Sequence, residues 1–157
     1  MGELVTVPVH RSQKSGFTLI ELMITVVVVV ILATLTYPSF MNQIRKSRRS
    51  DAIQALAALQ QAQERWRSQN LAYAGNGVIA TAWPTGLGLI VRTAGGYYDI
   101  AIATNPAPTG WSYAASATAV TGTSQASDTI GTTNCATLTV TVTNGNATYT
   151  PAACWSR

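Results

Sequence analysis

Charged residues are scarce in this chain of 157 residues: they make up 10% of the sequence, against 47% for hydrophobic residues. That charge density is low for a soluble protein of this size. The single histidine, His10, lies upstream of the main apolar segment. The sequence contains no phosphate-binding loop, zinc-protease motif or serine-centred glycine elbow, and its acidic residues are scattered. We therefore expect no catalytic residue, no metal site and no cofactor.

Cysteine is also rare and occurs only at Cys135 and Cys154, both near the C-terminus. Two cysteines spaced in this way in an exported chain favour one disulfide, formed in an oxidising compartment. A zinc site is disfavoured, because no second cysteine pair and no histidine cluster accompanies them. A bridge closing a loop of roughly 20 residues would be worth about 3 kcal/mol in the chain-entropy model.

The apolar residues are concentrated in one segment, residues 17–37, whose only charged residue is Glu21. At about 1.5 Å per residue this segment would form roughly 30 Å of helix, the thickness of a bilayer's hydrocarbon core. Six of the ten basic residues flank it: Arg11, Lys14, Arg45, Lys46, Arg48 and Arg49. We expect them to meet lipid headgroups and to solvate a helix surface. A nucleic-acid groove is the alternative, and the absence of aromatic residues among them counts against it.

The junction between Gly16 and Phe17 directly precedes the apolar segment. An ordinary secretory signal is cut after its apolar region at a small-residue site, and no such site closes this one. The string KSGFTLIEL, residues 14–22, resembles the class III signal of type IV pilins and type II secretion pseudopilins. The resemblance implies that a prepilin peptidase cuts between Gly16 and Phe17. It also implies that the new amine of Phe17 is methylated and that the apolar helix stays with the protein.

Two further residues of this segment stand out. Glu21 would cost about 2.5–3.5 kcal/mol inside a membrane span and should have a partner. Cleavage would supply the amine of Phe17, with a reference pKa near 7.7–8.0. Glu21 could pair with the amine of its own chain, one turn away. The resemblance implies instead a neighbour's amine, which would set the register of subunits. An unpaired position at the membrane interface is the remaining alternative.

Pro38, at the end of the apolar run, removes one helix hydrogen bond. It predicts either a helix kink or a segment that can stretch.

Beyond the apolar segment the chain predicts a head that begins with a continuing helix, from Ile44 to about Asn70. An apolar stripe at helical spacing should face the core: Ala52, Ile53, Leu56, Leu59, Gln63 and Trp66. The opposite, polar face should carry Arg48, Arg49, Gln54, Gln61 and Arg65.

Residues 71–96 are rich in glycine and form a turn-rich connector. Four strands are then expected at residues 97–103, 111–117, 136–143 and 147–150. Asn144-Gly145 is a hairpin turn between the last two. The predicted fold is α+β, a long N-terminal helix packed on a four-stranded antiparallel sheet.

Short strings in the head add to the resemblance. RRSDA, AQERW, SQASD and the terminal CW resemble PilE-type minor pilins, whereas residues 71–95 have no counterpart in that resemblance. We expect a cleaved leader at residues 1–16 and a transmembrane and filament-core helix at 17–43. Residues 44–157 should form a globular head with a C-terminal disulfide loop. The implied function is that of a structural subunit of the type IV pilus, a minor pilin and not an enzyme. It would act in pilus assembly and hence in twitching motility, adhesion or DNA uptake.

The resemblance also implies partners and a location. The partners are other pilin subunits, the prepilin peptidase, the inner-membrane assembly platform and, before assembly, the membrane itself. The chain would cross the bacterial inner membrane once with a periplasmic head, and later join an extracellular pilus. A major pilin and a type II secretion pseudopilin are structural alternatives. A pilus-surface DNA-binding pilin is another alternative. Nucleic acid is disfavoured as a partner, because few residues of the head are basic once the stretch directly after the apolar segment is set aside: Arg65, Arg67, Arg92 and Arg157.

Overall fold

A computed structural model describes residues 16–155, which fall into two compact units that divide between Ser39 and Phe40. One helix, α1 (Leu19–Arg67), contributes to both units. Its start is capped by Thr18, whose Oγ1 accepts the main-chain N–H of Glu21 at 3.3 Å. The rest of the predicted leader, residues 1–15 with His10, Arg11 and Lys14, lies outside the described residues, as does Arg157.

The first unit contains the apolar part of α1. Its most apolar 18-residue window has a mean hydropathy of 2.7 and none of it is buried within the chain. By length and composition this helix could cross a membrane. The helix continues through Pro38, and the hydroxyl of Thr34 donates to the carbonyl of Ile31 at 2.8 Å. The kink or stretch at Pro38 stays a prediction.

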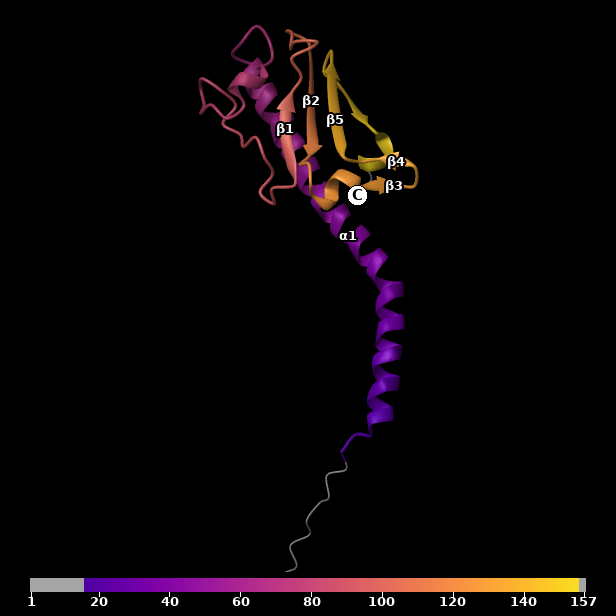
Figure 1. Ribbon diagram of the computed structural model, residues 1–157. Coiled ribbons are helices and arrows are strands. Elements are labelled where there is room, and N and C mark those ends of the chain that lie inside the picture. The colour runs from indigo at the N-terminus through magenta and orange to yellow at the C-terminus, as the bar shows by residue number, and fades with distance from the viewer. Residues whose placement is uncertain (1–15, 156–157) are drawn as a thin grey trace, which may run out of the picture. The chain divides into compact units, whose positions relative to one another are not determined.

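The second unit is an α+β head, as predicted. Its sheet has the order β1-β2-β5-β6, and every neighbouring pair is antiparallel. Figure 1 shows these strands beside the C-terminal part of α1. Their bounds are Tyr98–Ile102 for β1, Ser112–Ala119 for β2, Thr137–Thr143 for β5 and Asn146–Thr150 for β6. The hairpin β5–β6 turns at Asn144 and Gly145, whose φ angles of 51° and 78° suit the predicted Asn-Gly turn.

The core lies between the helix and the sheet because both elements place apolar residues on one face. Alternate residues of β1 and β5 are buried, as period-two strands require. On α1, Ala52, Leu56 and Leu59 are fully buried against them. Gln63 is also fully buried, and its side chain exchanges two hydrogen bonds, of 2.9 and 2.8 Å, with the main chain of Ala74. The predicted apolar stripe therefore includes a polar residue whose hydrogen bonds are satisfied.

Several short elements were not predicted from the sequence. β3 (Thr129–Ile130) pairs with β4 (Thr133–Asn134) as a small separate hairpin. Three short 3-10 helices complete the head: η1 (Asn76–Val78), η2 (Ser124–Ser127) and η3 (Ala152–Trp155).

The connector 71–96 is more than a set of turns, since Ile79 and Leu87 are buried in the core. A Cβ atom at Gly86 would overlap Thr81, so the connector folds tightly on itself.

Candidate functional site

The predicted processing and assembly residues lie at the N-terminal end of the first unit. Gly16 and Phe17 precede α1, and the Phe17 side chain is 83% exposed. Glu21 lies in the first helical turn, where a helix favours negative charge. Pro38 lies far along the same helix and is not brought near them by the chain. The roles of these four residues stay predictions.

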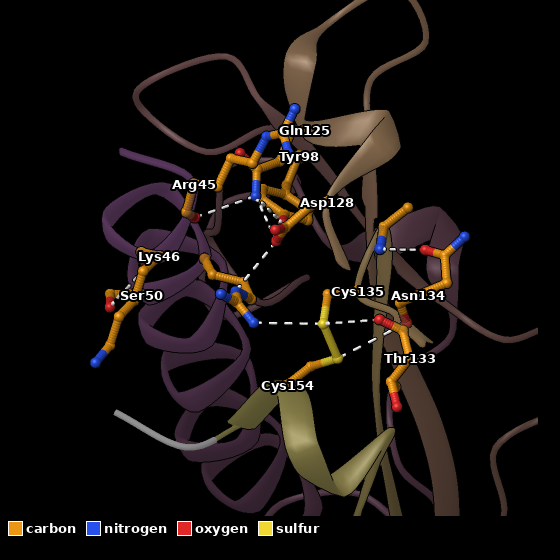
Figure 2. Close-up of polar contacts among 12 residues, drawn as sticks. Arg45, Lys46, Ser50, Tyr98, Gln125, Asp128, Thr133, Asn134, Cys135 and Cys154 are labelled. Atoms are coloured by element: carbon orange, nitrogen blue, oxygen red, sulfur yellow. Dashed lines mark hydrogen bonds and ion pairs between the residues drawn. A yellow bond between two sulfur atoms is a disulfide. The ribbon is translucent and has the colours of Figure 1, made fainter. Parts of the chain in front are cut away.

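The predicted disulfide is confirmed, since Cys135 and Cys154 are bonded and both are fully buried. The main-chain N–H of Cys135 donates to the carbonyl of Asp128 at 2.8 Å. From α1, Nη1 of Arg49 lies 3.3 Å from the sulfur of Cys135 (Figure 2). The disulfide loop is thereby held against the helix by a charged side chain.

Arg49 also forms a buried ion pair. Its Nε lies 3.1 Å from Oδ2 of Asp128, and the two side chains are 7% and 2% exposed. The contact does not have hydrogen-bond geometry, because Nε has no hydrogen-bond partner. The prediction from helical spacing that Arg49 lies on the polar face, away from the core, is wrong because its side chain is buried. Helical periodicity in a basic stretch cannot show an acidic partner that comes from a distant loop.

Gln125, in η2, links this ion pair to the sheet. Its side-chain nitrogen lies 2.9 Å from Oδ2 of Asp128, 2.9 Å from the hydroxyl of Tyr98 and 3.1 Å from the carbonyl of Arg45 (Figure 2). We call Arg49, Tyr98, Gln125 and Asp128 the buried polar cluster. Burial raises the pKa of the Asp128 carboxyl above its usual value, although Arg49 opposes the shift. Burial likewise raises the pKa of Tyr98 to about 12.

Two arginines of α1, the half-buried Arg48 and the exposed Arg65, lie over aromatic rings. The guanidinium carbon of Arg48 is 3.7 Å from the ring centre of Tyr97, and that of Arg65 is 5.0 Å from the ring centre of Trp83. Arg48 also donates to the hydroxyl of Ser124 at 2.7 Å. Other parts of the head therefore supply the aromatic residues that the basic stretch itself lacks, a contact between distant residues that the sequence does not reveal.

A second aromatic residue lies close to the end of α1, next to a residue that Arg67 contacts. Arg67 donates from Nε to the carbonyl of Gly110 at 2.6 Å. The next residue, Trp111, is 67% exposed. We call Arg65, Arg67, Trp83 and Trp111 the helix-end surface. It presents two indole rings and two guanidinium groups around the last turn of α1.

Some of the basic residues of the head form ion pairs with acidic residues, and others do not. Arg92 and Asp99 form a two-contact pair, of 2.6 and 3.1 Å, at the surface. This pair holds the pKa of Asp99 below its usual value. Within residues 16–155 the recorded ion pairs are those of Arg49 and Arg92. The other basic residues of this part of the chain form no ion pair within 4 Å: Arg45, Lys46, Arg48, Arg65 and Arg67. Arg45 nevertheless lies close enough to Asp128 to lower the pKa of that carboxyl against the effect of burial.

The described part of the chain contains no group of three or more His, Cys, Asp or Glu side chains that could hold a metal ion.

Two protein-family models match the sequence. One, described as type IV minor pilin ComP, DNA uptake sequence receptor, matches residues 38–139. That match includes the connector 71–95, for which the earlier resemblance offered no counterpart. The other, described as the prokaryotic N-terminal methylation motif, matches residues 11–37 and so includes Gly16, Phe17 and Glu21. A search of curated proteins found no match to the chain.

Proposed function

Because the chain belongs to the type IV minor pilin ComP family, and is therefore a structural subunit of the type IV pilus, we propose that its helix-end surface binds duplex DNA during uptake. Membership confirms the minor pilin predicted from the sequence. The family description names a DNA uptake sequence receptor, and the proposal extends that activity to this head.

The single observation that carries the proposal is the position of Arg65 over Trp83, with the exposed ring of Trp111 at the same end of the head. Arg65 is exposed and has no acidic partner, so it can meet a phosphate. An exposed indole ring can press against a groove or between base steps. Together they supply both a charge contact and an apolar contact.

The ion pairs of the folded head support DNA binding where the number of basic residues alone did not. A count of basic residues made the DNA-binding alternative weak, because it could not show which charges are neutralised. Arg92 is paired with Asp99, whereas Arg65 and Arg67 are not paired with any acid in the described residues. The chain folds Arg65 over the ring of Trp83, and it binds Arg67 to the carbonyl of Gly110, the residue before Trp111.

The test is fluorescence anisotropy of labelled duplex DNA with the full-length chain in mild detergent, across a salt series. Arg65→Gln should weaken binding and reduce the salt slope by about 1, as expected for one lost phosphate contact. Trp111→Ala should weaken binding roughly 5- to 100-fold if its ring packs on DNA. Arg92→Gln removes the same charge from the Asp99 pair and serves as the control. Equal losses for Arg65→Gln and Arg92→Gln would argue against the helix-end surface.

We further propose that Gly16 and Phe17 form the cleavage and methylation site, and that Glu21 neutralises the Phe17 amine of a neighbouring subunit. The methylation-motif match across these residues supports this. Glu21 lies in the first helical turn, at the same end of the helix as the Phe17 amine, so a neighbouring helix would meet its carboxylate at that end.

The chain is a membrane-anchored pilin. We propose that its head is periplasmic in the inner membrane and extracellular once assembled. The partners would be other pilins, the prepilin peptidase and the inner-membrane assembly platform.

A further inference from the structure

A pocket of about 350 Å³ opens on the head beside the first turns of α1 that follow the apolar segment. The helix lines it with Asn42, Gln43, Lys46 and Arg49, and the opposite wall is formed by residues 128–131. The helix side therefore supplies two amides and two cations, against one carboxylate, Asp128. This composition suits an anionic ligand with several oxygen atoms.

Of the two basic residues that line this pocket, Lys46 is the one that the head leaves unused. Arg48 is bound to Ser124 and Tyr97, and Arg49 to Asp128 and Cys135. The Lys46 side chain is exposed, and its ammonium group has no recorded partner among residues 16–155. A cation that lines a pocket without a partner is free to bind a ligand there.

The other cation of the pocket wall, Arg49, is already used by the head. Its side chain is buried, its Nε is shielded from solvent, and its charge is paired with Asp128. Lys46 therefore supplies the positive charge that a ligand in the pocket can reach.

The position of the pocket indicates the source of the ligand. Asn42 and Gln43 end the segment expected to cross the membrane, so the pocket lies where headgroups would meet the chain. The helix-end surface begins at Arg65, about 30 Å farther along the same helix at 1.5 Å per residue. The two surfaces can therefore bind different ligands.

We propose that this pocket binds the phosphate headgroup of an anionic phospholipid, such as phosphatidylglycerol, while the subunit is anchored in the membrane. Lys46 contacts the phosphate, and Asn42 and Gln43 contact headgroup oxygens. The bound lipid holds the base of the head at the bilayer surface, and it is released when the subunit leaves the membrane.

The test uses the full-length chain in nonionic detergent, titrated with phosphatidylglycerol or phosphatidylcholine and observed by native mass spectrometry. Wild type should retain one phosphatidylglycerol per chain and much less phosphatidylcholine. Lys46→Gln should lower that occupancy about fivefold, the effect of one basic residue near an anionic surface. Arg65→Gln removes the same charge far from the pocket and should leave occupancy unchanged. Equal melting temperatures would show that both variants are folded.

Four outcomes would overturn the proposal. Equal retention of both lipids, or equal losses in the two variants, would indicate non-specific attraction. Displacement of the lipid by millimolar inorganic phosphate would identify a free-phosphate site instead. If Lys46→Gln weakened duplex binding as much as Arg65→Gln and left lipid retention unchanged, the pocket would be a nucleic-acid contact. Failure of DNA binding alone would leave the lipid result standing.

Discussion

The guanidinium of Arg49 and the carboxylate of Asp128 lie 3.1 Å apart in the interior of the head. The pair joins α1 to the loop that leads into the disulfide, since the carbonyl of Asp128 also accepts the N–H of Cys135. Removing two charges from water is costly, and the attraction between them offsets that cost only in part. The pKa of Asp128 is raised because burial disfavours the charged carboxylate more strongly than Arg49 favours it.

Arg49→Met should lower the free energy of unfolding by about 3–5 kcal/mol at neutral pH, because Asp128 would stay buried without its cation. Burial raises the folded-state pKa of Asp128 above its unfolded value, and the variant should raise it further. The folded chain then binds a proton more readily than the unfolded chain, so stability rises as the pH falls through that raised pKa.

Urea unfolding of the variant and the wild type at pH 7 and pH 4 measures this effect, and the loss should be smaller at pH 4. Arg48→Met, at the neighbouring half-buried residue, is the control and should show a smaller loss. A loss for Arg49→Met that is equal at both pH values would contradict the prediction.

Cys135→Ser should lower the stability of the head by roughly 2–4 kcal/mol, because the unfolded chain would lose the constraint of the closed loop. Protease sensitivity of the C-terminal segment should increase with it. The double variant Cys135→Ser, Cys154→Ser controls for a new free thiol and should behave alike. An unchanged unfolding midpoint in both variants would show that the bridge contributes no stability.

Gly16→Val should block removal of the leader, because a β-branched side chain would replace hydrogen next to the bond to be cut. Gly16 has no atoms near its missing Cβ, so the substitution should leave the fold intact. Intact-mass measurement should show all 16 leader residues retained, while Ser15→Ala should be processed normally. A mature N-terminus at Phe17 in the valine variant would refute the cleavage site.

Glu21→Val should leave the chain inserted and processed but poorly incorporated into filaments. The more apolar span should insert at least as well as the wild type. An amine left unpaired between packed helices would weaken docking by several kcal/mol. The readout is the ratio of subunit in sheared filaments to subunit in membranes, with Glu21→Asp expected to be intermediate. A ratio equal to that of the wild type would exclude the pairing role.

The elements that could be predicted depend on local sequence. Alternating residues identified β1, β2, β5 and β6, and the Asn144-Gly145 turn fixed one hairpin because those two residues accept positive φ. The helix was visible from its apolar spacing and from the lack of glycine within it. The disulfide followed because the chain offers only one possible pair.

The parts that could not be predicted depend on contacts between distant residues. Helical spacing alone puts Arg49 on the polar face, because its partner Asp128 lies in a loop far along the chain. Trp83 and Tyr97 gave no sign in the sequence that they would cover Arg65 and Arg48. The hairpin β3–β4 was missed because strands of two residues are too short to show an alternating pattern.

The buried polar cluster also has a mechanical consequence. A filament under tension pulls on each subunit along α1, and the pull enters the head from its first helical turns. Arg49 is the first buried residue of α1 in the chain direction, and its side chain contacts both Asp128 and Cys135. A force applied along α1 would therefore be transmitted through Arg49 to the loop that the disulfide closes. We expect reduction of the disulfide to lower the force at which a single head unravels, even at temperatures where the reduced head stays folded at rest.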